Sequence, residues 1–181
     1  MQSLTRLTAP LVLSCALATT AQATTLVKMS TEQMTARATD IVVGTVTGTR
    51  SVWVDRTLVT LAKVSVSESL KGGARSELTV VLPGGVDATR AVPVAVTWPG
   101  APVLNAREDV VLFLESDAPV KDGHQIVGFS QGKYSVVRDA FGRTFASQTR
   151  IVSAEAVDLA SFKNRIRELV RKGGEAARSE R

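Results

Sequence analysis

Chemistry at a nucleophilic site would depend on a single histidine, because His124 is the only one in the sequence. It lies in a turn-forming stretch, residues 121–125, between two apolar runs. A Ser-His-Asp or Cys-His site needs its histidine within hydrogen-bond reach of the nucleophile, and no nucleophile motif surrounds this one. Loop histidines without such a motif are usually solvated, so we expect an exposed hairpin residue and assign no catalytic role.

Metal ligands are equally few. One histidine and one cysteine cannot build a closed zinc site. Glu115, Asp117 and Asp122 lie close together along the chain, and carboxylate oxygens suit calcium. Their spacing lacks the glycine and the final glutamate of an EF-hand loop, which favours a solvated acidic turn over a calcium site. The sequence therefore predicts no metal and no cofactor.

The beginning of the chain has the pattern of an export signal. Arg6 precedes an apolar run, and Ala21-Gln22-Ala23 forms a small-x-small cleavage site. We predict a signal peptide over residues 1–23, one domain over residues 24–172 and a flexible basic tail over residues 173–181. The protein is then periplasmic or secreted. A lipoprotein cleaved and acylated at Cys15 is the alternative.

Hydropathy and charge exclude two classes of partner. A transmembrane helix needs about 20 uninterrupted apolar residues, and no such run is found. Residues 24–160 carry 14 Lys or Arg and 14 Asp or Glu, whereas residues 161–181 carry 7 and 3. A neutral body with a basic end and few aromatic residues is a poor surface for nucleic acid. We expect neither a membrane span nor a nucleic-acid partner.

Between two predicted helices the chain follows the pattern of a β protein. Ser30 and Gln33 form a capping-box pair that predicts a short helix over residues 31–38. Apolar residues at helical spacing predict an amphipathic helix over residues 158–172, ended by Gly173 and Gly174. A β-branched run, a continuous apolar run and stretches of alternating apolar residues, separated by turn residues, predict short strands between them. These strands cover residues 41–46, 58–69, 77–82, 109–114, 125–129, 133–138 and 143–147.

Many short antiparallel strands with one helix on each side favour a small closed or partly open β-barrel over a flat sheet, because closure removes exposed edges. Gly44 inside the first strand indicates a strong bend. The long second strand suits a barrel of the oligonucleotide/oligosaccharide-binding (OB) type. We therefore predict a mainly β, OB-like antiparallel barrel with a short N-terminal helix and a C-terminal amphipathic helix.

Several stretches also resemble a family of exported bacterial domains of unassigned function. The shared motifs are Asp-Ile-Val-Val-Gly-Thr-Val, Val-Ser-Glu-Ser-Leu-Lys-Gly, Pro-Gly-Gly, Glu-Asp-Val-Val-Leu-Phe-Leu and Gly-Phe-Ser-Gln-Gly-Lys, within residues 26–170. The resemblance implies a glycine directly before Glu108, where this chain has Arg107. The first half is also distantly similar to netrin-like barrels of metalloproteinase inhibitors. Their mechanism uses an N-terminal cysteine, and the predicted mature chain has none.

Two tryptophans are the candidate binding residues. Residues 83–108 fall outside the strand pattern, hold four of the six prolines and form a long loop that predicts a contact surface. Trp98, followed by Pro99, is either a rigid binding anchor or a side chain folded back onto the barrel. Trp53 is expected to pack against its own hairpin.

The basic face of the C-terminal helix is a second candidate surface. Its cations could attach the protein to an anionic envelope surface, or the helix could simply cover one end of the barrel, which the apolar stripe favours. The candidate attachment residues are Arg165, Arg167, Arg171 and Lys172.

Three functions remain open from sequence. The leading hypothesis is an exported, non-catalytic binding domain for a protein or envelope polymer, with residues 83–108 as its contact surface. A small hydrolase or peptidase whose site is invisible in sequence is the second. Envelope attachment through the basic helix is the third.

Overall fold

The computed structural model describes residues 27–179, and the predicted signal peptide and Cys15 lie outside this range. The protein is mainly β, with a mixed eight-stranded sheet, a short N-terminal helix and a longer C-terminal helix. In chain order the elements are α1 (Thr31–Arg37), β1 (Asp40–Val54), β2 (Thr57–Lys71), β3 (Glu77–Pro83), β4 (Gly85–Asp87), β5 (Val94–Val96), β6 (Asp109–Glu115), β7 (Gly123–Ile126), β8 (Lys133–Arg138), β9 (Thr144–Ser147), β10 (Val157–Asp158) and α2 (Leu159–Ser179).

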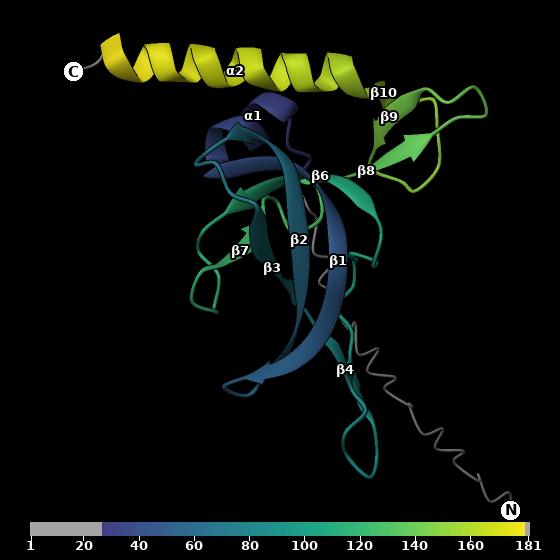
Figure 1. Ribbon diagram of the computed structural model, residues 1–181. Helices are drawn as coiled ribbons and strands as arrows, with labels where there is room; N and C mark the ends of the chain where they lie inside the picture. Colours follow the sequence, from purple (N-terminus) through teal and green to yellow (C-terminus); the bar gives the residue numbers. More distant parts are fainter. Residues whose placement is uncertain (1–26, 180–181) are drawn as a thin grey trace, which may run out of the picture.

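Part of the sheet curls into a partial ring. The strand order is β1-β2-β3-β7-β6-β8-β9-β10, and β1 also pairs with β6. All of these pairings are antiparallel except the parallel contact of β3 with β7. Figure 1 shows the long, curved β1–β2 hairpin beside β3, β6 and β7. Irregular register in the N-terminal half of β1 accompanies the bend expected at Gly44, where a Cβ would lie 2.3 Å from the Ser65 carbonyl oxygen.

The additional pairing of β1 with β6 closes the ring from β1, β2, β3, β7 and β6. The ring encloses an apolar cluster to which all five of these strands contribute. Its buried members are Val42, Val46, Ala62, Val64, Leu78, Val80, Leu82, Leu104, Val110, Leu112, Leu114 and Ile126.

A second cluster joins the outer face of the sheet to both helices. Phe162 and Ile166 of α2 are buried there with Met34 of α1 and Phe113 of β6. Figure 1 shows α2 lying across one end of the fold, beside α1, with its C-terminal end extending past the body. The apolar stripe of α2 therefore packs against the sheet and α1. This is the covering role that the sequence offered as the alternative to attachment at an envelope surface.

Two sequence predictions about secondary structure were wrong, one for residues 83–108 and one for the end of the last helix. Residues 83–108 are not an uninterrupted loop, because β4 and β5 form a hairpin inside them. Strands of three residues are too short to show an alternating pattern. The last helix does not end at Gly173 and Gly174 but continues to Ser179. Ion pairs from Arg171 to Glu175 and from Lys172 to Glu168 support its exposed end.

Candidate functional site

An apolar groove of about 320 Å³ opens on the surface beside the 83–108 segment. Its apolar lining combines β2, β3, the Trp98 turn and the turn after β7. A pocket of this size lies at the small end of the range for ligand sites, so it suits a few side chains better than a large cofactor. The apolar side chains that line it include Val59, Val81, Pro83, Trp98, Ile126 and Phe129.

The groove exists because β3 and β7 diverge. Their parallel pairing covers only Thr79 with Gly123 and Val80 with His124. The next residues of β7 pair instead with β6, Gln125 with Glu115 and Ile126 with Leu114. Beyond Val80, among the described strands, β3 is paired only along its β2 edge. The groove lies where the two strands separate, and Val81 of β3 and Ile126 of β7 line it.

Trp98 stands at the rim on a rigid turn. The Ala101 amide donates to the Trp98 carbonyl oxygen at 3.1 Å, with Pro99 second and Gly100, at φ +74°, third. Proline followed by a glycine of positive φ is the signature of a type II turn. The indole packs over Gly84, where a Cβ would lie 3.4 Å from Trp98 Cδ1. Trp98 is nevertheless 52% exposed, so it is folded back and still presents a free face.

Phe129 reaches the groove through a strained backbone. It has φ +68° directly after Gly128 at φ +64°. The left-handed conformation costs a bulky L-residue about 1–2 kcal/mol, and such strain is concentrated at functional sites. A Cβ on Gly100 would lie 3.8 Å from Phe129 Cε1, so the ring lies near the Trp98 turn. Phe129 was predicted as the last residue of a strand but lies in a turn. Gly128 and Gly132, on either side of residues 129–131, were the sequence signal for that turn.

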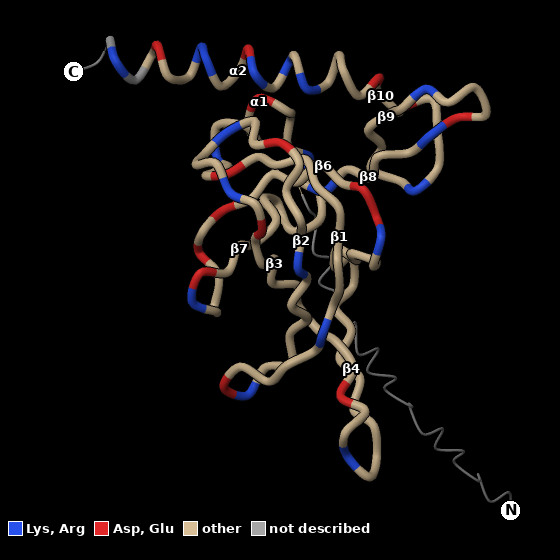
Figure 2. The backbone as a smooth tube through the Cα atoms, in the orientation of Figure 1, with Lys and Arg blue, Asp and Glu red and all other residues tan. Residues whose placement is uncertain are grey.

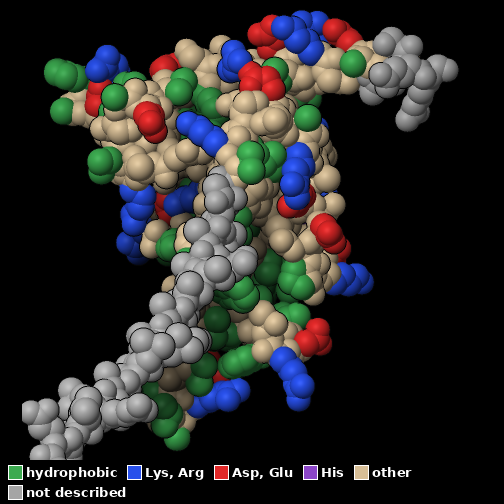
Figure 3. Space-filling model, turned by 180° about the vertical axis from the view of Figure 1, so that it is seen from behind, with side chains coloured by type: hydrophobic (Ala, Val, Ile, Leu, Met, Phe, Trp, Pro, Cys, Tyr) green, Lys and Arg blue, Asp and Glu red, His purple; other side chains and the backbone are tan. Residues whose placement is uncertain are grey.

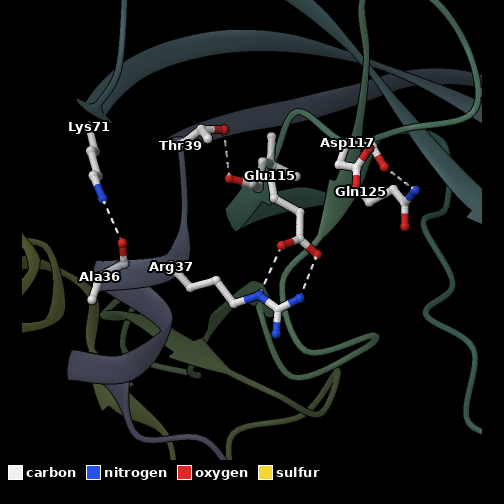
Figure 4. A network of polar contacts seen from close by, with 8 residues as sticks. Ala36, Arg37, Thr39, Lys71, Glu115, Asp117 and Gln125 are labelled. Carbon is white, nitrogen blue, oxygen red and sulfur yellow. Dashed lines mark hydrogen bonds and ion pairs between the residues drawn. The ribbon is translucent and has the colours of Figure 1, made fainter.

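One end of the groove is polar but electrically balanced. Arg37 of α1 donates through Nε and Nη2 to the two carboxylate oxygens of Glu115, at 2.9 and 3.4 Å. Gln125 donates from Nε2 to the carbonyl oxygen of Asp117. Figure 4 shows the arginine reaching from the helix to β6, with Gln125 beside it. Because the two charges neutralise each other, this end favours neither anions nor cations.

The segment that carries Trp98 is anchored at both ends. At its start, the Gly84 amide donates to the Leu58 carbonyl at 3.1 Å, and Thr60 Oγ1 donates to the Gly84 carbonyl at 2.8 Å. At its end, Leu104 is buried in the ring core. Glu108 follows, and its carboxylate accepts from Ser135 Oγ at 2.7 Å.

Glu108 is the electrostatic centre of this second anchor. Burial raises its pKa, but hydrogen bonds from Lys133, Ser135 and Asn105 outweigh burial and lower the pKa to about 2. The preceding residue, Arg107, has φ +66°, the backbone conformation that the implied glycine would adopt. Its amide donates to the Val46 carbonyl at 2.7 Å. The turn into β6 is therefore formed without that glycine.

Trp53 lies away from the groove. It is 40% exposed at the end of β1, and its Nε1 donates to Asp87 Oδ2 at 2.8 Å. The guanidinium of Arg90 lies 4.9 Å from its ring centroid. Hydrogen bonds from Thr89 and Trp53 hold the pKa of Asp87 well below its usual range. Trp53 thus contacts the β4–β5 hairpin, whereas the sequence predicted contact with its own hairpin, β1–β2.

The helix cations that the sequence singled out are all paired. Arg165 bonds Glu32 and Arg167 bonds Glu68, which bridges α2 to α1 and β2. Arg171 and Lys172 pair within the helix. Figure 2 shows acidic residues interspersed with the basic ones along α2. Among residues 27–179, no helix is both long and apolar enough to cross a bilayer.

His124 is buried, so the expected exposed histidine is wrong. It is 3% exposed, and Nε2 lies 3.6 Å from Asp40 Oδ2. Asp40 also accepts from Thr39 Oγ1 and lies 3.7 Å from Arg75 Nε. His124 Nδ1 has no hydrogen-bond partner among the described residues, so no hydroxyl is placed there as a nucleophile. The parallel contact of β7 with β3, which periodicity cannot predict, draws this histidine inward.

The three loop carboxylates do not come together. Glu115 binds Arg37, and within residues 27–179 no three His, Cys, Asp or Glu side chains could hold one metal ion. A larger hollow of about 750 Å³ lies between α2, β8 and residues 28–32, with a mixed lining that includes Tyr134, Gln148 and Arg165. It contains none of the tryptophan candidates.

Seen from behind, hydrophobic side chains gather over the lower half of the molecule, where the β4–β5 hairpin and the end of the β1–β2 hairpin lie (Figure 3). Among the described residues, Trp98 is the sequence candidate that lines a concave apolar surface, the groove. Comparisons of the chain with protein-family models, with curated proteins and with solved structures found no match.

Proposed function

We propose that this protein is an exported, non-catalytic binding domain that takes an extended, uncharged segment of a partner protein into the groove beside Trp98. The observation that carries the proposal is a half-exposed tryptophan on a rigid turn above a concave apolar floor. A side chain held in advance loses little conformational entropy when a partner docks, which is why tryptophan is common among binding hot spots.

The proposed fold for this task is a small, partly open barrel of the OB type. The ring β1-β2-β3-β7-β6, with its parallel contact between β3 and β7, supports that description. OB barrels bind ligands over the face of their second and third strands, and Val59 and Val81 line the groove from β2 and β3. Among the described residues that line the groove, the one cation, Arg37, is paired with Glu115, which favours a polypeptide over a nucleic-acid strand.

The two alternatives have less support. A hydrolase with a histidine base would have to use the buried Asp40–His124 pair, which does not line the groove or the larger hollow beside α2. Envelope attachment would have to use cations of α2 that already bind carboxylates. Both alternatives predict no role for Trp98.

The test is selection of short random peptides displayed on phage against the full chain, followed by titration of the selected synthetic peptides. Trp98→Ala should weaken binding about 30-fold, the size of a hot-spot loss of about 2 kcal/mol. Trp53→Ala is the matched control, because it removes the same residue type outside the groove and should leave affinity unchanged. Failure to select any peptide, or equal binding to both variants, overturns the proposal.

A further inference from the structure

The strand that lines the groove beside Trp98 is already fully engaged. Val81 and Leu82 of β3 are only 5% and 4% exposed. Leu82 pairs with Thr60 of β2, and the residue before Val81 is bridged to β7. A guest that depends on a backbone ladder, as an added strand does, would find the groups of β3 occupied. The guest must therefore be a segment that needs no such ladder.

The side chains of the groove offer rings in place of backbone donors. Two aromatic residues line it: Trp98 is 52% exposed, and Phe129 is half-buried beside the Trp98 turn. Three further lining residues have no amide hydrogen to donate, because they are prolines: Pro83, Pro102 and Pro119. Such a surface suits apolar rings of a guest better than a hydrogen-bonded strand.

Trp98 also carries one hydrogen-bond donor at the rim. The equivalent donor of Trp53 is used, because its Nε1 donates to Asp87 Oδ2. Within residues 27–179, Trp98 Nε1 has no acceptor. The polyproline II helix fits a single donor beside aromatic rings, since it has no internal hydrogen bonds and its carbonyl oxygens face outward.

We infer that the partner segment is rich in proline and binds as a polyproline II helix, an inference that rests on the proposed function. Its proline rings pack against Trp98 and Phe129, and one of its carbonyl oxygens accepts from Trp98 Nε1. The helix is formed before binding, so docking costs little conformational entropy. Aromatic-lined grooves are the usual receptors for this conformation. The neutral Arg37–Glu115 pair at one end of the groove matches an uncharged guest.

The experiment compares two peptide libraries displayed on phage, of equal length and diversity, selected against the full chain. One library has proline fixed at two positions three residues apart, which is one turn of the helix, and the other has alanine there. Binders should come from the proline library. Replacing either fixed proline of a selected peptide by alanine should weaken binding about tenfold, because a ring contact is lost and the free peptide becomes less ordered.

Trp98→Phe tests the indole donor on the protein side, because it keeps an aromatic face and removes the N–H. Affinity for a selected proline peptide should fall about fivefold, the usual size of one net hydrogen bond. Trp53→Phe is the matched control and should leave affinity unchanged. Equal affinity for Trp98→Phe and the wild type overturns the contact from the indole to the guest carbonyl.

The outcomes separate this inference from the proposed function. Binders that depend on Trp98 but come equally from both libraries overturn the polyproline II conformation and leave the proposed function standing. Absence of any Trp98-dependent binder from either library overturns both.

Discussion

Glu108 and Lys133 form an almost buried ion pair. Lys133 Nζ lies 2.7 Å from Glu108 Oε1, and the two side chains are 11% and 5% exposed, lysine first. The same ammonium donates to the Val103 carbonyl oxygen at 2.7 Å. The pair therefore ties the end of the Trp98-bearing segment to β8.

Glu108→Gln should lower the free energy of unfolding by about 3 kcal/mol, because it leaves a nearly buried lysine without its counter-charge. Urea denaturation measures this as a shift of the midpoint at unchanged slope. Glu77→Gln is the matched control, since its ion pair with Lys63 is exposed and worth less than about 1 kcal/mol. Equal midpoints for Glu108→Gln and the wild type would contradict the anchoring role.

The same carboxylate makes stability depend on pH. The pKa of Glu108 is about 2 in the folded protein against an ordinary value of 4.5. Its contribution is fully present above pH 4.5 and is lost as the pH falls from about 4.5 toward 2. Over that interval the wild type should lose more stability than Glu108→Gln. Because other carboxylates titrate in both proteins, the quantity to measure is the difference between their unfolding free energies as a function of pH. Parallel curves would contradict the lowered pKa of Glu108.

Arg107→Gly should stabilise the protein by up to about 1 kcal/mol. A left-handed backbone costs arginine about 1–2 kcal/mol, and glycine avoids this cost. Glycine also has more conformational freedom in the unfolded chain, which lowers the net gain in stability. Arg50→Gly in β1 should instead be destabilising, because φ at Arg50 is not positive. Thermal unfolding of the two variants separates these outcomes, and a lower Tm for Arg107→Gly would refute the strain argument.

Phe129→Gly should separate folding from binding. Relief of the strained φ offsets part of the lost packing, so stability should change by about 1 kcal/mol or less, whereas peptide affinity should fall about tenfold or more. Phe141→Gly, which truncates a side chain that is 85% exposed, is the control and should leave affinity intact. Unchanged affinity for Phe129→Gly would remove this residue from the binding surface.

Replacing Gly173 and Gly174 together by alanine should increase helix content. Each glycine inside a helix costs about 1 kcal/mol relative to alanine, and neither has an atom within 4 Å of an added Cβ. Circular dichroism at the helix wavelengths measures the gain. No gain in helicity would mean that the helix does not continue past these residues in solution.

Local sequence signals predicted much of the fold and less of the site. The Ser30–Gln33 capping box is confirmed by both of its hydrogen bonds, at 3.2 and 2.8 Å. The stretches predicted over residues 58–69, 77–82 and 133–138 are confirmed as strands by their backbone pairings in β2, β3 and β8. The bent first strand is confirmed too, although it runs on to Val54 where polar residues hide its period.

What the sequence could not provide was contact between distant residues. The burial of His124 follows from a strand pairing that joins β7 to β3, and the position of Phe129 follows from two consecutive left-handed residues. Trp98 was identified from its type and its neighbouring proline, but the floor beneath it depends on where β7 leaves β3. Gly173 and Gly174 were predicted to end the last helix, but the helix continues past them, where ion pairs one turn apart offset part of their intrinsic penalty.

The double anchoring of residues 83–108 has a consequence for how such a protein could diversify. Leu58 and Thr60 hold one end, and Leu104 and Glu108 hold the other, so the exposed Trp98 turn between them is carried by contacts that do not involve the tryptophan itself. Natural selection can rewrite that stretch, and with it the recognised sequence, while the scaffold is inherited unaltered.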